Sequence, residues 1–246
     1  MDPADFDRLV ARAADPRLIP GIYNYCDGRC PRCPFTERCL TFLDNRDLES
    51  AGEPSSIGEM VSASLQRTLE ILTEVARREG IDLENISKGD PAPEIEDDAE
   101  RQGRDPLVVS AREYGELAWR IARALEPVVA RRGDASVCEA VDTIEWFSTM
   151  LSAKIRRAIC GQSDGWEDRD GVQADHNGSA KVALLGIAES RAAWSVLMEA
   201  GKATADGAPA QAVKMLDALD RDVRARFPRA TEFVRPGFDE PESQNV

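Results

Sequence analysis

Four cysteines lie within fourteen residues near the N-terminus, and thiolates are ligands for soft and borderline metal ions. They are Cys26, Cys30, Cys33 and Cys39, in the spacing C-x3-C-x2-C-x5-C. Four thiols supplied by so short a stretch match the ligand number of tetrahedral zinc and of a cubane iron–sulfur cluster. The segment is therefore predicted to hold one inorganic centre.

The spacing favours an iron–sulfur cluster, with zinc as the alternative metal. Structural zinc sites usually combine two well-separated C-x2-C pairs, whereas here only Cys30 and Cys33 have that spacing. Pro31 and Pro34 follow these cysteines directly, and proline stiffens a turn, which is more typical of a cluster-binding loop. The remaining alternatives are two structural disulfides, which require an oxidising compartment, or free thiols.

Three arginines alternate with the cysteines, namely Arg29, Arg32 and Arg38. We expect them to border the cofactor and to offset the charge of the thiolates. The first three cysteines have the spacing that radical S-adenosylmethionine enzymes use, but those enzymes are β/α barrels with one open iron. Here no strand–helix alternation is visible and Cys39 supplies a fourth ligand. A closed centre of this kind suits structure or electron transfer better than substrate binding.

Two glutamates provide a candidate second metal site. Glu145 and Glu189 fall beside or within the apolar stripes of their expected helices, where carboxylates are rarely buried unless paired or metal-bound. A standard di-iron site is not expected, because the single histidine, His176, lies in an expected loop. Solvated groups or structural ion pairs are the alternative interpretation of both glutamates.

The elements that must position these residues are predicted to be helices. Apolar residues recur at helical spacing, and no alternation typical of strands stands out. We expect an all-α fold: a helical bundle of four to five long helices with an N-terminal cysteine-rich metal-binding segment. The expected helices cover residues 4–14, 37–47, 55–78, 106–129, 135–159, 179–201 and 208–227.

Three regions follow from composition. Residues 1–50 form the cysteine-rich segment with short helices, residues 51–234 form the helical bundle, and residues 235–246 form a tail. An acidic linker with two prolines is expected inside the bundle region, over residues 82–105.

The overall charge excludes some classes of binding partner. The formal net charge of the 246 residues is −14, which argues against nucleic acid and against an anionic membrane surface. The acidic N-terminus shows no signal peptide, and no apolar stretch is long enough to span a membrane. We expect a cytoplasmic protein with an unidentified protein or redox partner, and the sequence leaves a homo-oligomer open.

One block of the chain resembles a known group. The residues from Tyr23 to Asp27, followed by Cys30, Cys33-Pro34-Phe35-Thr36 and Arg38-Cys39, resemble a block near the N-terminus of an uncharacterised group of bacterial proteins. That group is also similar in a helix carrying Glu145-Trp146 and in the segment Asn177-Gly178-Ser179-Ala180-Lys181. The resemblance covers most of the chain and implies no activity or substrate.

Three functions are compatible with these observations. The leading expectation is a metal-binding protein with a binding or electron-transfer role. The first alternative is a metalloenzyme whose bundle core holds a metal through carboxylates and receives electrons from the cysteine centre. The second is an interaction module that zinc holds together, without catalysis.

Overall fold

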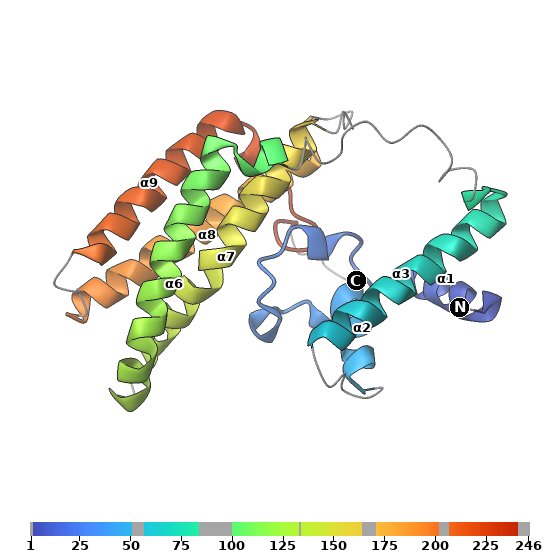
Figure 1. Cartoon of the computed structure of the whole chain (residues 1–246), viewed down its shortest axis with the longest axis horizontal. Coiled ribbons are helices and arrows are strands. Elements are labelled where there is room, and N and C mark those ends of the chain that lie inside the picture. The colour runs from blue at the N-terminus through green and yellow to red at the C-terminus, as the bar shows by residue number, and fades with distance from the viewer. Residues whose placement is uncertain are drawn as a thin grey trace. The chain divides into compact units, whose positions relative to one another are not determined.

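The computed structural model describes residues 2–50, 57–83, 100–132, 134–163, 171–201 and 207–240 (Figure 1). Within these ranges every regular element is a helix and no strand occurs, which confirms the predicted all-α class. None of the described helices combines the length and apolarity that a membrane crossing requires.

The chain divides into two compact units. The first, here called the N-terminal unit, comprises Met1–Tyr23 and Gly28–Ile95, and the second, the bundle unit, comprises Asn24–Asp27 and Glu96–Val246. This division differs from the predicted one in two respects. The long helix before the acidic linker belongs to the N-terminal unit, and four residues of the cysteine-rich segment belong to the bundle unit.

Four long helices dominate the described part of the bundle unit. They are α6 (Pro106–Arg132), α7 (Ala135–Ser163), α8 (Asp175–Glu199) and α9 (Ala208–Arg226). Helix α7 packs against α6 and α8. Helix α9 also packs against α6 and α8 (Figure 1). The 3-10 turn η4 (Ala230–Glu232) lies on α8.

Local sequence explains where these helices begin. Pro106 occupies the first turn of α6, and the Asp105 carboxylate accepts a hydrogen bond from the Leu107 N–H at 2.9 Å. The Asp134 carboxylate accepts from the Ser136 N–H at 3.1 Å and so caps α7. Both starts confirm the prediction from sequence.

The predicted start of α8 at residue 179 is wrong. The helix begins at Asp175, and the side-chain amide of Asn177 donates to the carbonyl of Gly171 at 2.7 Å. An acidic residue in the first helical turn is favourable because it faces the positive end of the helix dipole. The polar composition of this stretch had suggested a loop, yet it forms the first turn of the helix.

The bundle core is closely packed around three aromatic side chains. Trp194, Tyr114 and Phe147 are almost fully buried, and the Trp194 indole N–H donates to the Tyr114 hydroxyl at 3.1 Å. Burial raises the pKa of the Tyr114 hydroxyl. Helices α6 and α7 approach closely at Gly115, where a Cβ atom would lie 2.1 Å from the carbonyl oxygen of Ser148. Only glycine fits this crossing.

The described elements of the N-terminal unit are α-helices and the turns of the cysteine-rich segment. The helices are α1 (Pro3–Ala13), α2 (Leu40–Ser50) and α3 (Ile57–Glu79), and the turns η2 (Cys30–Arg32) and η3 (Thr36–Arg38) lie between α1 and α2 in the chain. Another short turn, η1 (Ile22–Asn24), leads out of this unit.

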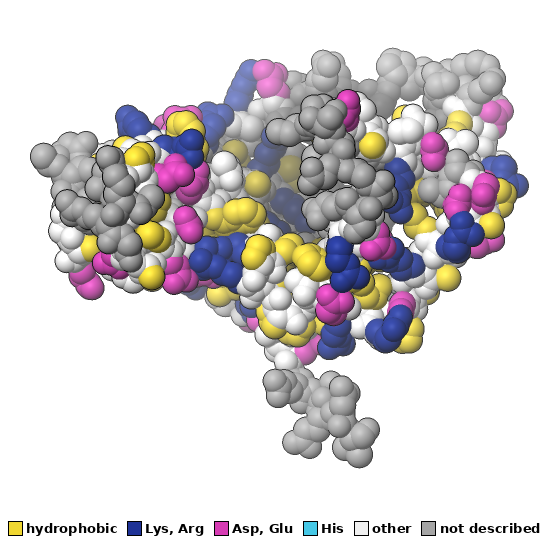
Figure 2. All heavy atoms as spheres, turned by 90° about the horizontal axis from the view of Figure 1, so that it is seen from below, with side chains coloured by type: hydrophobic (Ala, Val, Ile, Leu, Met, Phe, Trp, Pro, Cys, Tyr) yellow, Lys and Arg dark blue, Asp and Glu magenta, His cyan; other side chains and the backbone are white. Residues whose placement is uncertain are grey.

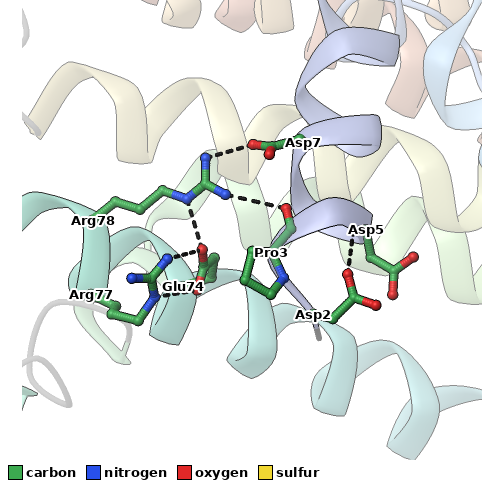
Figure 3. A network of polar contacts seen from close by, with 7 residues as sticks. All are labelled: Asp2, Pro3, Asp5, Asp7, Glu74, Arg77 and Arg78. Carbon is green, nitrogen blue, oxygen red and sulfur yellow. Dashed lines mark hydrogen bonds and ion pairs between the residues drawn. The ribbon is translucent and has the colours of Figure 1, made fainter.

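An ion-pair network joins α3 to α1 (Figure 3). The buried Glu74 carboxylate accepts hydrogen bonds from Arg77 at 2.6 Å and from Arg78 at 2.7 Å. Arg78 also donates to Asp7 of α1 at 2.7 Å. The hydrogen bonds from Arg77 and Arg78 lower the pKa of Glu74 to about 2.

Within the N-terminal unit, the apolar stripe of α3 stays largely exposed; the sequence had assigned this helix to the bundle region, residues 51–234. Its large side chains are between 38% and 60% exposed, namely Val61, Leu65, Leu69, Leu72 and Val75. Figure 2 shows apolar side chains reaching the surface among charged ones on one face of the molecule. Helix α3 packs on α1 through the side that carries Glu74.

Candidate functional site

The cysteine segment of the N-terminal unit is built from tight turns. Gly28 has a φ of 74°, and its carbonyl accepts from the Cys30 N–H at 3.0 Å. The Cys33 N–H donates back to the Cys30 carbonyl at 3.1 Å, and the Phe35 N–H donates to the Cys33 sulfur at 3.4 Å. These turns make the segment compact without a long helix or a strand.

All six cysteines of the chain are free and partly exposed, including Cys26, Cys30, Cys33 and Cys39. The two-disulfide reading is therefore not observed. Among the described residues, no group of three or more His, Cys, Asp or Glu side chains is arranged to hold a metal ion. The four-cysteine centre stays a prediction from spacing.

Residues Asn24–Asp27 are fixed to the bundle unit by hydrogen bonds from α7. The Trp146 indole N–H donates to the Asp27 carbonyl at 2.8 Å, and the Lys154 ammonium donates to the Asn24 carbonyl at 2.9 Å. The backbone on each side of Cys26 thus has its own partner on the same helix. We call residues 24–27 the anchored segment.

The Tyr25 side chain holds the anchored segment on α8. Its hydroxyl donates to the Asp175 carboxylate at 3.0 Å, and Arg157 forms an ion pair with the same carboxylate at 2.7 Å. The Tyr25 ring packs on Phe233 with ring centroids 4.6 Å apart. Gly178 makes room for both rings, since a Cβ atom there would lie 2.4 Å from Tyr25 and 2.7 Å from Phe233.

A cluster of charged side chains at the Phe233 backbone supports this packing. Lys181 donates to the Phe233 carbonyl at 2.5 Å and pairs with Asp239 at 2.7 Å. Burial opposes the charge on Asp239, but hydrogen bonds from Arg235 and Lys181 hold the pKa of this carboxyl well below its usual range. The residues of the Asn177–Lys181 segment therefore support the Tyr25 contact.

Electrostatics link the anchored segment to α7. Burial lowers the pKa of Lys154, and the charge of Cys26 is the largest interaction that counteracts this shift. A thiolate at Cys26 and an ammonium at Lys154 therefore stabilise each other. A cationic neighbour of this kind is a recognised way to favour the thiolate form of a cysteine.

The three predicted arginines lie on the turns of the cysteine segment. Arg32 and Arg38 are exposed and Arg29 is half-buried. The Arg38 guanidinium donates to the carbonyl of Arg17 at 3.1 Å, so part of its hydrogen-bonding capacity is used within the N-terminal unit. The role of these arginines beside a cofactor stays a prediction from the sequence.

The two glutamates of the candidate second site do not face the core together. Glu189 is exposed on α8, and Glu145 is half-exposed on α7 at 3.7 Å from Arg123. The expectation that both point inward is therefore wrong for Glu189. A carboxylate at the edge of an apolar helix face can stay outside the core at little cost in free energy. The core is then filled by the apolar side chains beside it.

Sequence reasoning did not identify Lys154, Arg157 and Asp175 as partners of the cysteine segment. A signal was present, because Trp146, Lys154 and Arg157 recur at helical spacing along one side of α7. That pattern marks a polar helix face, but it does not reveal which distant segment covers it.

Comparison with family models, with curated proteins and with solved structures finds no match to the chain.

Proposed function

We propose that the protein binds a metal centre through the thiolates of Cys26, Cys30, Cys33 and Cys39, and that it has a binding or electron-transfer role. One observation carries the proposal: the first cysteine of a four-thiol run is held between two anchored carbonyls and beside a half-buried ammonium. Such an environment favours the thiolate, which is the form that ligates metals.

Anchoring lowers the entropic cost of using Cys26 as a ligand. Its neighbours Asn24 and Asp27 are already ordered by Lys154 and Trp146, so less conformational freedom is lost on binding. The hydrogen bond from the Phe35 N–H to the Cys33 sulfur is of the kind that orients a thiolate ligand and tunes its reduction potential.

Charge balance also supports the proposal. Four thiolates around one centre carry net negative charge, and Lys154, Arg29, Arg32 and Arg38 supply cations on or near the same stretch of chain. We favour an iron–sulfur cluster, with zinc in the same ligand set as the alternative. Metal binding and local ordering are coupled at such sites, so the cysteine turns close when the metal binds.

The proposal requires a compartment in which thiols stay reduced, such as the cytoplasm. It does not include a carboxylate metal site in the bundle, because Glu189 is exposed. If the metal is zinc, the same ligands act as a structural clamp and the protein is an interaction module rather than an electron carrier.

Anaerobic purification followed by metal analysis tests the proposal. We expect one iron–sulfur cluster or one zinc ion per chain, and each of the four Cys→Ser variants should lower the metal content. Cys138→Ser is the matched control, because this cysteine is also free and half-buried but lies in α7. Its metal content should equal that of the unchanged protein.

Spectroscopy separates the two metals. An iron–sulfur cluster gives visible thiolate-to-iron charge-transfer absorption that bleaches on reduction, whereas a zinc protein is colourless. Protein that binds neither metal after reconstitution with iron, sulfide or zinc would refute the proposal. Metal content that survives loss of two of the four thiols would also refute it.

A further inference from the structure

Two exposed tryptophans on neighbouring helices line one pocket of the bundle unit. Trp119 of α6 is 52% exposed and Trp146 of α7 is 41% exposed. The pocket has a volume of about 370 Å³, within the range of small-molecule sites. The residues that line it are Trp119, Asp142, Glu145, Trp146, Ser148 and Thr149.

The pocket is preorganised by the packing beneath it. Helices α6 and α7 meet closely at Gly115 and Ser148, one turn before Trp119. The Trp146 indole N–H is already bound to the Asp27 carbonyl at 2.8 Å, which fixes the plane of this ring. The partly exposed ring lines the pocket, and its only hydrogen-bond donor is already occupied.

The polar groups of the pocket are acceptors rather than free donors. The Ser148 hydroxyl donates to the Glu145 carbonyl at 2.6 Å, and the Thr149 hydroxyl donates to the Trp146 carbonyl. Glu145 lies 3.7 Å from Arg123. Asp142 makes neither a hydrogen bond nor an ion pair with any residue in the described part of the chain. Its carboxylate is the free charge of the pocket.

We propose that this pocket binds the ammonium group of a small organic cation, with a methylated ammonium as the best fit. Indole faces attract cations through the ring quadrupole, and the Asp142 carboxylate supplies the complementary charge. An anion would meet two carboxylates and no free cationic side chain in the pocket lining. The net charge of −14 also raises the local concentration of cations.

Calorimetric titration with choline tests the inference on the full-length protein, with neohexyl alcohol as the uncharged control of the same shape. We expect choline to bind about tenfold more tightly than the alcohol, which corresponds to the usual strength of a cation–π contact. Equal affinity for the two compounds would overturn the proposal, because it would make the pocket merely apolar. Binding of glucose in place of choline would identify a carbohydrate site and would also overturn it.

Two variants locate the site. Trp119→Ala removes one indole face, and Asp142→Asn removes the free charge while keeping the side-chain shape. Each should weaken choline binding about tenfold, and Glu139→Gln, which removes an exposed carboxylate of α7 outside the pocket, should not. Unchanged binding in both variants, or no choline binding at tens of millimolar, would refute the inference. Neither result depends on the metal content of the protein.

Discussion

Gly178→Ala is the sharpest test of how the anchored segment is held. The added methyl group would lie 2.4 Å from Tyr25 and 2.7 Å from Phe233, so at least one ring must move. Overpacking costs about 1–3 kcal/mol, and the displaced Tyr25 hydroxyl loses a hydrogen bond of roughly 1 kcal/mol. Alanine stabilises a helix by about 1 kcal/mol relative to glycine, which offsets part of this cost. The net loss of stability is therefore about 1–3 kcal/mol.

Urea unfolding followed by far-ultraviolet circular dichroism measures this loss. Gly103→Ala is the matched control, because a methyl group there meets nothing within 4 Å and should leave stability unchanged or slightly raised. The same substitution at Gly178 in a Tyr25→Ala background should cost clearly less, since one clashing ring is gone. If Gly178→Ala is as stable as the unchanged protein, Tyr25 does not pack on α8 as described.

Three further predictions concern packing and charge. Gly115→Ala should destabilise the bundle by about 3 kcal/mol, seen as a lower melting temperature, because the methyl group meets the Ser148 carbonyl. The contact of α3 with α1 should weaken as pH falls from 4.5 towards 2, because Glu74, whose pKa is lowered to about 2, pairs in its ionised form with Arg78, and Arg78 in turn pairs with Asp7 of α1. Hydrogen exchange in α1 should report this, and Glu74→Gln should abolish the pH dependence. Burial lowers the pKa of Lys154, so the folded state binds fewer protons there and stability should rise with pH between that lowered pKa and 10.5. Lys154→Met should flatten the rise in urea-unfolding experiments at alkaline pH.

The helices of the bundle could be read from the sequence because their signals are local. Pro106 and Asp134 mark helix starts by chemistry that acts within one turn. The packing partner of the apolar stripe of α3 could not be predicted in the same way. A helical repeat of apolar residues predicts an amphipathic helix, but not which other element covers its apolar face.

The candidate site was predicted only in part, for the same reason. Its cysteines are close in sequence, so their spacing was informative. The contacts that hold Cys26 join residues more than one hundred positions apart, as in the bonds from Trp146 to Asp27 and from Tyr25 to Asp175. Such pairs produce no periodic pattern in a single sequence, because each residue fits only the pattern of its own helix or turn.

The anchored segment has a consequence for dividing the protein into fragments. Residues 24–27 belong to the bundle unit, whereas the chain before and after them belongs to the N-terminal unit. A recombinant fragment that begins near residue 100 would lack Tyr25, leaving Asp175 without its phenol donor and Phe233 without its ring partner. A synthetic peptide that spans Tyr23–Gly28 should bind such a fragment in trans, as in fragment complementation. The bundle is complete only when the N-terminal sequence supplies this short insert.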